Sequence, residues 1–135
     1  MKKLLAIVVF ALTTWGITAQ TSKEENSTFY INVFINKDKD IRIESDLVEF
    51  KNVSQKVKKR IYAHPFKLDE NVTYRIFADE NLMLGYIMDV ENEMLEAYNL
   101  NIKRERYLLE TVKTEIDGPN WFKKLEGMKL EKMKG

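Results

Sequence analysis

Few residues of this sequence are of the kinds that carry out chemistry. In 135 residues there is 1 histidine and no cysteine. A serine nucleophile needs a base beside it, and the only candidate base, His64, stands directly before Pro65. We interpret His64 as a surface or capping residue at the end of a helix. The sequence therefore predicts no catalytic residue and no enzyme activity.

Acidic residues are the remaining candidates for a metal site or an acid–base pair. Two close pairs are spaced as solvated charges and not as converging metal ligands: Asp38 with Asp40, and Glu91 with Glu93. Asp79 and Asp89 are candidates for the paired carboxyls of a glycosidase. However, Asp79 is better placed to cap a helix, and Asp89 lies next to the apolar position Val90. We expect no metal and no cofactor.

The C-terminal tail, residues 117–135, combines aromatic and basic side chains. It opens with the turn-forming sequence Asp-Gly-Pro, and between Asn120 and Gly135 it has five lysines against two glutamates. Three residues of a short amphipathic helix are candidates for contact with a partner: Trp121, Phe122 and Leu125. Such a helix lies on an anionic membrane surface or docks on a protein. The alternative is that its aromatic residues close the open face of a sheet, with the lysines in solvent.

The first half of the chain is expected to form a hairpin and a helix. Apolar residues alternate with a period of two from Phe29 to Ile35, which is typical of a strand, and a second strand, Ile41 to Ile43, follows a charged turn. A helix is expected from Asn52, which with Gln55 resembles a capping box, to His64, because the following proline disfavours helical geometry. The segment between these elements, residues 47–50, fits either a strand or a helix.

The second half repeats the alternation of strand and helix. A strand is expected over Val72 to Ala78, a helix over Leu82 to Tyr98, and a last strand within Lys103 to Val112. The predicted fold class is α+β, with the order β-β-α-β-α-β. We expect a mixed sheet of four to five strands with two helices on one face, followed by the short C-terminal helix.

The first residues have the three parts of an export signal. Lys2 and Lys3 precede an apolar run from Leu4 to Ile17, and Ala19 is a small residue at the expected cleavage point. Residues 1–19 are therefore predicted to be a signal peptide and residues 20–27 a flexible leader. The apolar run is shorter than the ~20 residues that span a membrane as a helix. The product is expected to be periplasmic or secreted, and the alternative is a short anchor in the inner membrane with the domain facing the periplasm.

Length and charge limit the classes of partner. The chain that remains after residue 19 is long enough for one domain, which we place at residues 28–116. The whole chain has 22 basic and 21 acidic residues. A protein with so little net charge lacks the basic surface that nucleic acid requires, so nucleic acid is not expected as a partner.

The segment from Val72 to Thr111 resembles the periplasmic domain of the ExbD/TolR biopolymer-transport family. In that family an alternating strand runs into Ala-Asp and is followed by a helix with a glycine and regular Val or Ile positions. Five positions match this pattern: Ala78, Asp79, Gly85, Ile87 and Val90. Asn99 stands where a glycine is usual. The opening hairpin and the helix that ends at His64 fit the same domain, so the resemblance covers residues 28–112.

The resemblance implies a subunit of an inner-membrane motor that couples proton flow to work at the outer envelope. Such subunits act through strand-mediated dimers and contacts with other envelope proteins, and their soluble domain has no catalytic role. The family carries a protonatable aspartate in its membrane helix, whereas the run from Leu4 to Ile17 has no acid. The resemblance therefore implies a soluble paralogue or an accessory subunit that does not drive proton flow alone.

The expected function is that of an exported, non-enzymatic recognition domain, an accessory of an envelope energy-transducing or protein-transport complex. Its expected working edge is the strand with Phe29, Ile31, Val33 and Ile35, because an apolar edge strand pairs readily with another chain, a second copy included. On this hypothesis Val33→Pro weakens self-association or partner binding. The alternative is a small secreted protein that binds a ligand or polymer in a groove on the bare sheet face, lined by Tyr74, Ile76 or Tyr107.

Overall fold

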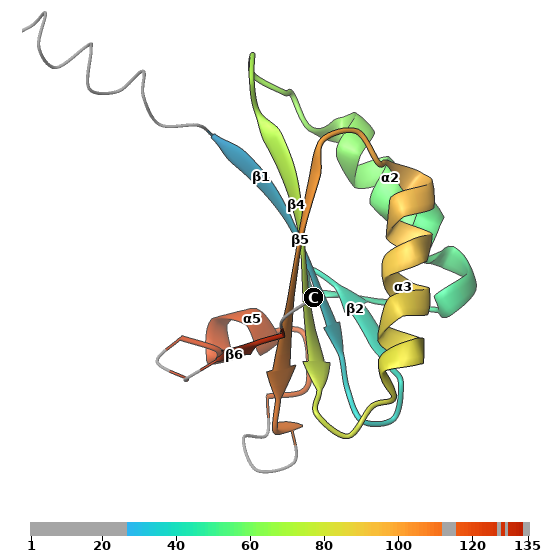
Figure 1. Ribbon diagram of the computed structural model, residues 1–135, viewed down its shortest axis with the longest axis vertical. Helices are drawn as coiled ribbons and strands as arrows, with labels where there is room; N and C mark the ends of the chain where they lie inside the picture. Colours follow the sequence, from blue (N-terminus) through green and yellow to red (C-terminus); the bar gives the residue numbers. More distant parts are fainter. Residues whose placement is uncertain (1–26, 112–115, 127, 129, 134–135) are drawn as a thin grey trace, which may run out of the picture.

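The computed structural model describes residues 27–111, 116–126, 128 and 130–133. These residues form one mixed sheet with two helices packed on one face, while the C-terminal segment lies against the other face (Figure 1). In chain order the elements are β1 (Thr28–Ile35), β2 (Ile41–Ile43), β3 (Asp46–Val48), η1 (Phe50–Asn52), α2 (Val53–Ala63), β4 (Asn71–Asp79), α3 (Leu84–Ala97), β5 (Ile102–Leu109), α5 (Trp121–Lys124) and β6 (Glu131–Lys132). The predicted α+β class is confirmed, and of the segment left open by the sequence, residues 47–50, the first two belong to the short strand β3.

Three long parallel strands make up the centre of the sheet, whose order is β3-β2-β1-β4-β5-β6. β1 pairs with β4 over its full length, from Thr28 opposite Asn71 to Ile35 opposite Ala78, and β4 pairs with β5 in the same way. The helices α2 and α3 lie in the connections between these parallel strands, as the crossover geometry of such strands requires. The short strands β2 and β6 flank the carboxyl-terminal halves of β1 and β5.

The main core lies between the sheet and the two helices. Each helix contributes buried residues at spacings of three or four, which are Val53, Val57 and Ile61 from α2, and Ile87, Val90 and Met94 from α3. They pack on one face of the sheet, where Ile31, Val33 and Ile35 of β1 are buried. The alternation read from the sequence therefore identifies the face of β1 that points toward the helices.

Tyr74 places one polar group within this core. Its buried hydroxyl donates to the carbonyl oxygens of Met94 and Tyr98, at 3.1 and 2.7 Å, and so ties β4 to the end of α3. Burial raises the pKa of Tyr74, so the hydroxyl keeps the proton that these hydrogen bonds require.

The helix ends agree only in part with the sequence-based predictions. α2 ends at Ala63, and His64 leaves the helical conformation directly before Pro65, as predicted. The predicted capping box is wrong, because the side chain of Asn52 makes no capping hydrogen bond. Asp79 does not cap α3 either, since that helix begins after Met83.

The second core lies on the sheet face opposite α2 and α3. Trp121, which is 0% exposed, packs with Phe34 and Phe77 at ring-centroid distances of 5.2 and 5.5 Å. Ile116 and Leu125 are buried in the same cluster. The C-terminal segment therefore closes the open face of the sheet, which is the alternative that the sequence left open for the tail.

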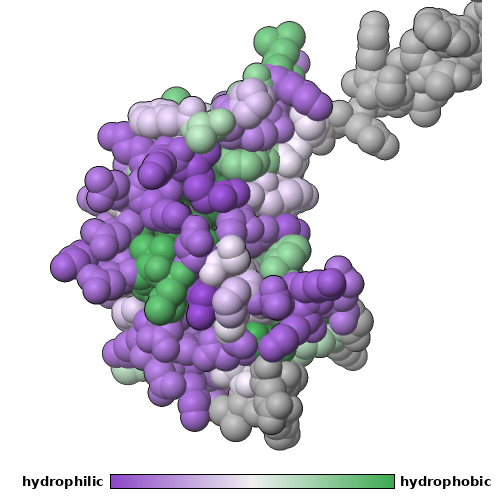
Figure 2. All heavy atoms as spheres, turned by 180° about the vertical axis from the view of Figure 1, so that it is seen from behind, coloured by the Kyte–Doolittle hydropathy of each residue, from purple (hydrophilic) through white to green (hydrophobic). Residues whose placement is uncertain are grey.

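The surface seen from behind is mostly hydrophilic, and its apolar side chains gather in small patches (Figure 2). No helix among the described residues is long and apolar enough to cross a membrane. The predicted signal peptide, nearly all of the predicted leader, and residues 112–115, 127, 129 and 134–135 lie outside the described residues.

Candidate functional site

The outer edge of β1 is paired along only half of its length. β2 pairs with Val33, Phe34 and Ile35, whereas no described strand pairs with the first residues of β1 on that side. Backbone groups of a strand point alternately to its two neighbours. The N–H of Asn71, at the start of β4, donates to the carbonyl of Ser27, just before β1. The backbone groups of the odd-numbered residues of β1 therefore point to β4. Those of the even-numbered residues, the N–H and C=O of Tyr30 included, point to the outer edge.

Glu44 ends the pairing of β2 with β1. With a φ of 53°, it turns the chain away from β1 and back along β2 as β3. Its N–H still donates to the carbonyl of Asn32 at 2.9 Å, but the N–H of Asn32 donates to the Glu44 carboxylate, at 3.0 Å, in place of a backbone carbonyl. A side chain thus occupies the last pairing position, and the outer edge beyond it, residues 28–31, has no described neighbour.

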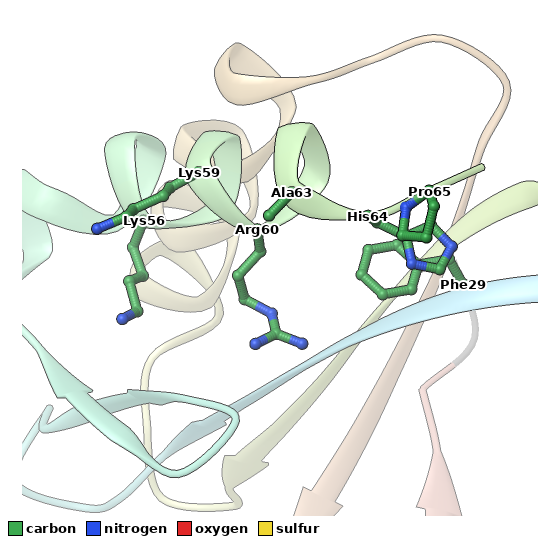
Figure 3. Close-up of a pocket in the computed structure, with 7 residues that line it drawn as sticks. All are labelled: Phe29, Lys56, Lys59, Arg60, Ala63, His64 and Pro65. Carbon is green, nitrogen blue, oxygen red and sulfur yellow. The ribbon is translucent and has the colours of Figure 1, made fainter.

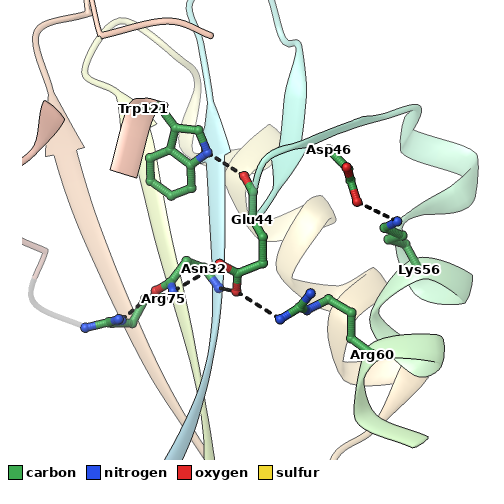
Figure 4. A network of polar contacts seen from close by, with 7 residues as sticks. All are labelled: Asn32, Glu44, Asp46, Lys56, Arg60, Arg75 and Trp121. Carbon is green, nitrogen blue, oxygen red and sulfur yellow. Dashed lines mark hydrogen bonds and ion pairs between the residues drawn. The ribbon is translucent and has the colours of Figure 1, made fainter. Parts of the chain in front are cut away.

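A polar network fixes this end of the hairpin (Figure 4). Arg75 on β4 donates to the Asn32 side-chain oxygen at 2.7 Å, and Arg60 on α2 lies 3.7 Å from the Glu44 carboxylate. The indole N–H of Trp121 donates to the Glu44 carbonyl at 2.6 Å. Glu44, at the boundary of the open edge, is therefore contacted both from the helix side and from the opposite side of the sheet.

A groove of about 380 Å³ lies between α2 and the sheet, beside β1. Its lining residues are Phe29, Lys56, Lys59, Arg60, Ala63, His64 and Pro65. Lys56 and Arg60 extend from α2 toward the strands, and the rings of Phe29, His64 and Pro65 lie together at the other end (Figure 3). The helix α2 therefore extends over the outer edge of β1, where no described strand continues the sheet.

His64 is more than the surface or capping residue expected from the sequence. Its N–H does cap α2, donating to the Ile61 carbonyl at 3.2 Å, but its ring stacks on Phe29 at 3.8 Å. Its Nε2 lies 2.9 Å from the carboxylate of Glu70. The hydrogen bond from the Lys67 N–H, followed by that from His64, lowers the pKa of Glu70. His64 thus forms one wall of the groove.

The other open edge of the sheet, on β5, is lined by charge. β6 pairs only with Tyr107 and Leu108, so the beginning of β5 has no described partner on its outer side. The residues there are Ile102, Lys103, Arg104 and Glu105. Charged side chains on an edge strand disfavour pairing with another chain. The apolar and aromatic edge of β1 is therefore the better docking site.

Glu91 was expected to be a solvated charge, and this prediction is wrong. The side chain is 2% exposed on the inner side of α3 and forms an ion pair with Arg106 of β5. Its Oε1 also accepts from the Arg106 Nε at 3.2 Å. A buried carboxylate needs such a partner, so the pair belongs to the packing of α3 on the sheet.

The residues that the sequence suggested for partner binding have different positions in the structure, and most of them are buried. Ile31, Val33 and Ile35 are core residues, and β1 is not an edge strand beyond Asn32, because β2 and β4 flank it there. Trp121 and Leu125 are buried, and only Phe122, which is half-exposed, remains accessible in the tail. Of the four nominated residues of β1, Phe29 alone contributes to the groove.

The positions that carry the family resemblance are mostly structural. Ala78, Ile87 and Val90 are buried in the core, whereas Gly85 is exposed in the first turn of α3. Asp79 is 0% exposed at the end of β4.

The carboxylate of Asp79 joins the segments that follow β4 and β5. It accepts hydrogen bonds from the N–H of Asn81 at 2.8 Å and from the hydroxyl and N–H groups of Thr111. Burial alone raises the pKa of Asp79, but the hydrogen bonds from Thr111 and Asn81 outweigh it and lower the pKa. Since Asp89 is exposed on α3, the two aspartates do not form an acid–base pair.

The described residues contain no group of three or more acidic, histidine or cysteine side chains that could hold a metal ion. The opposite sheet face has a second hollow of about 210 Å³, lined by Arg75, Phe77, Tyr107, Phe122, Leu125, Glu126 and Leu130. Tyr74 and Ile76, nominated for a groove on this face, are buried beneath the helices instead. The volume of this hollow is below the ~300 Å³ at which the volumes of small-molecule sites begin.

The basic wall of the groove was not recognised from the sequence. Lys56, Lys59 and Arg60 follow one another at spacings of three and one, and α2 contains no acidic residue. This excess of basic residues was the sequence feature that could have indicated the basic wall. What the sequence did not reveal was that the helix face lies over an open strand edge.

No known protein-family model matches this chain, and no curated protein matches it significantly. The resemblance to the ExbD/TolR family therefore stays a prediction from the sequence.

Proposed function

We propose that this protein is a non-enzymatic recognition domain that binds an extended segment of a partner protein at the open half of the outer edge of β1. The observation that carries the proposal is the early end of β2, which leaves residues 28–31 without a described neighbour on their outer side, beneath α2. An extended segment that adds to a sheet edge gains main-chain hydrogen bonds, and its side chains give specificity.

The composition of the edge supports this proposal. The exposed ring of Tyr30 stacks under the Arg75 guanidinium at 3.8 Å, and Phe29 packs with His64, so the side chains beside the open N–H are held in place. A preorganised edge loses little conformational entropy when it binds. The open edge of β5 has the opposite character, since charged residues follow one another there.

The cellular setting follows from the sequence alone. The predicted export signal and the resemblance to the ExbD/TolR family support a role in the cell envelope, as an accessory of an energy-transducing or transport complex. The partner would be another envelope protein or a second copy of the chain. The proposal assigns no reaction to the domain.

The test is selection of short random peptides on the full-length chain, followed by amide exchange in the complexes. A peptide that adds to β1 is expected to slow exchange of the Tyr30 amide by about tenfold or more. The amides of Phe29 and Ile31 already face β4 and are expected to change little.

Two proline variants provide the matched comparison. Tyr30→Pro removes the outward N–H and is expected to abolish peptide binding, whereas Tyr30→Ala keeps this donor and is expected to retain part of the affinity. Arg104→Pro makes the same backbone change at the open edge of β5 and is expected to bind normally. Selected peptides that bind Tyr30→Pro as well as the wild type, or that protect β5 instead, would contradict the proposal.

A further inference from the structure

We infer that the segment bound by β1 carries an aspartate or glutamate side chain, which the basic wall of α2 receives. This inference rests on the proposed strand addition and specifies its partner as an acidic extended segment. It follows from three features of the groove: its charge, its unsatisfied donor and the direction in which an added strand points its side chains.

The charge of the groove is one-sided. Three of its lining residues are cations, Lys56, Lys59 and Arg60, and none is acidic. Two carboxylates stand at the β2 end: Asp46 lies 2.8 Å from Lys56, and Glu44 lies 3.7 Å from Arg60. These two pairs leave the charge of Lys59 uncompensated, because Lys59 forms no ion pair with a described residue.

Arg60 has a donor that its neighbours do not use. Its Nε is shielded from solvent and has no hydrogen-bond partner among the described residues. A buried donor without an acceptor costs roughly 1–3 kcal/mol, and this cost would be removed if the Arg60 side chain shifted to present its Nε–H to a bound carboxylate. Arginine is also the side chain best suited to hold a carboxylate.

The pleat of the sheet brings the partner's side chains to this wall. Residues directly opposite each other on neighbouring strands point to the same face. Ile31 points toward the helices and belongs to the core beneath α2, as does Phe29, which lines the groove. Residues of an added strand that lie opposite these two would therefore point toward the cations of α2, while its other side chains would point away.

The inference is tested with three short synthetic peptides, each acetylated and amidated so that no terminal charge remains. In the first, glutamate alternates with valine, and in the other two glutamine or lysine replaces every glutamate. We expect the glutamate peptide to bind the full-length chain most tightly, the lysine peptide not to bind, and the affinity of the first to fall as salt is added. Affinity is measured by fluorescence anisotropy, and the register by protection of the Tyr30 amide.

Lys59→Glu and Lys58→Glu form the matched pair of variants. Both lysines are exposed on α2, but Lys59 lines the groove, whereas the ammonium of Lys58 lies over the ring of Tyr62. Lys59→Glu is expected to weaken binding of the glutamate peptide by about tenfold, and Lys58→Glu by about twofold or less. Neither change affects the core, so circular dichroism should be unaltered.

The outcomes separate this inference from the proposed function. If the glutamine and glutamate peptides bind equally and both protect Tyr30, strand addition holds and the preference for acid is wrong. If the glutamate peptide binds without protecting Tyr30, both statements are overturned, because the anion then binds without strand pairing. Failure of the glutamate peptide to bind overturns the inference, while peptides from the random selection still decide the proposed function.

Discussion

The buried polar residues of this protein owe their positions to partners that lie far away in the chain. Asp79 binds Thr111, which lies 32 residues later, and Glu91 binds Arg106, 15 residues later. Local sequence patterns suggested a helix cap for Asp79 and a solvated charge for Glu91. Both predictions failed because the roles of these residues depend on which strands become neighbours, and spacing within one segment does not contain that information.

Asp79 is expected to make the stability of the fold depend on pH. Its pKa in the folded protein lies below the usual value of 3.8, so its contribution is complete above that pH and is lost as the pH falls through the folded pKa. Asp79→Asn should therefore reduce the loss of unfolding free energy between pH 7 and pH 3. Urea unfolding at both pH values measures this, with the exposed Asp89→Asn as the control. An unchanged pH dependence in Asp79→Asn would show that its carboxylate does not hold the segments after β4 and β5 together.

At the scale of elements, the sequence predicted the long strands, the two main helices and the hairpin of β1 with β2, but not β6 or the pairing of β1 with β4. Alternation from Phe29 to Ile35 correctly identified a strand with one buried face. It could not show that the crossover through α2 places β4 on one side of β1 while the hairpin places β2 on the other. The open edge is therefore only the first half of the strand that the sequence predicted as an edge. It ends at Glu44, and nothing in the sequence indicated the left-handed backbone of this residue.

This topology changes the test that the sequence suggested for β1. Val33 faces β4 with its backbone and the core with its side chain, so Val33→Pro is expected to reduce the unfolding free energy by about 3 kcal/mol or more. Tyr30→Pro should cost clearly less, because proline is tolerated where an N–H points away from the sheet. Chemical denaturation of both variants, followed by circular dichroism, makes the comparison. Equal losses would show that a strand already pairs with β1 at Tyr30.

At the scale of the whole molecule, the C-terminal segment completes the domain. Without it, Phe34 and Phe77 would face solvent, since Trp121 covers both. The sequence left two roles open for this tail, and the buried Trp121 and Leu125 identify the closing of the sheet as the role of that part. The indole also holds Glu44, so the same residue that closes the second core stabilises the boundary of the proposed docking edge.

Removal of residues 116–135 is therefore expected to destabilise the whole domain and not only its end. Truncation of a buried tryptophan to alanine alone costs about 3–5 kcal/mol, which is a large part of the about 5–15 kcal/mol that holds a typical domain together. The truncated chain should bind a hydrophobic dye and unfold at lower urea concentration, and Trp121→Ala should show most of the same loss. Removal of residues 131–135 alone, which takes away β6 but leaves Trp121 in place, should cost much less. If the long truncation unfolds like the intact chain, the second core contributes little, and the tail is then free for the partner contact that the sequence first suggested.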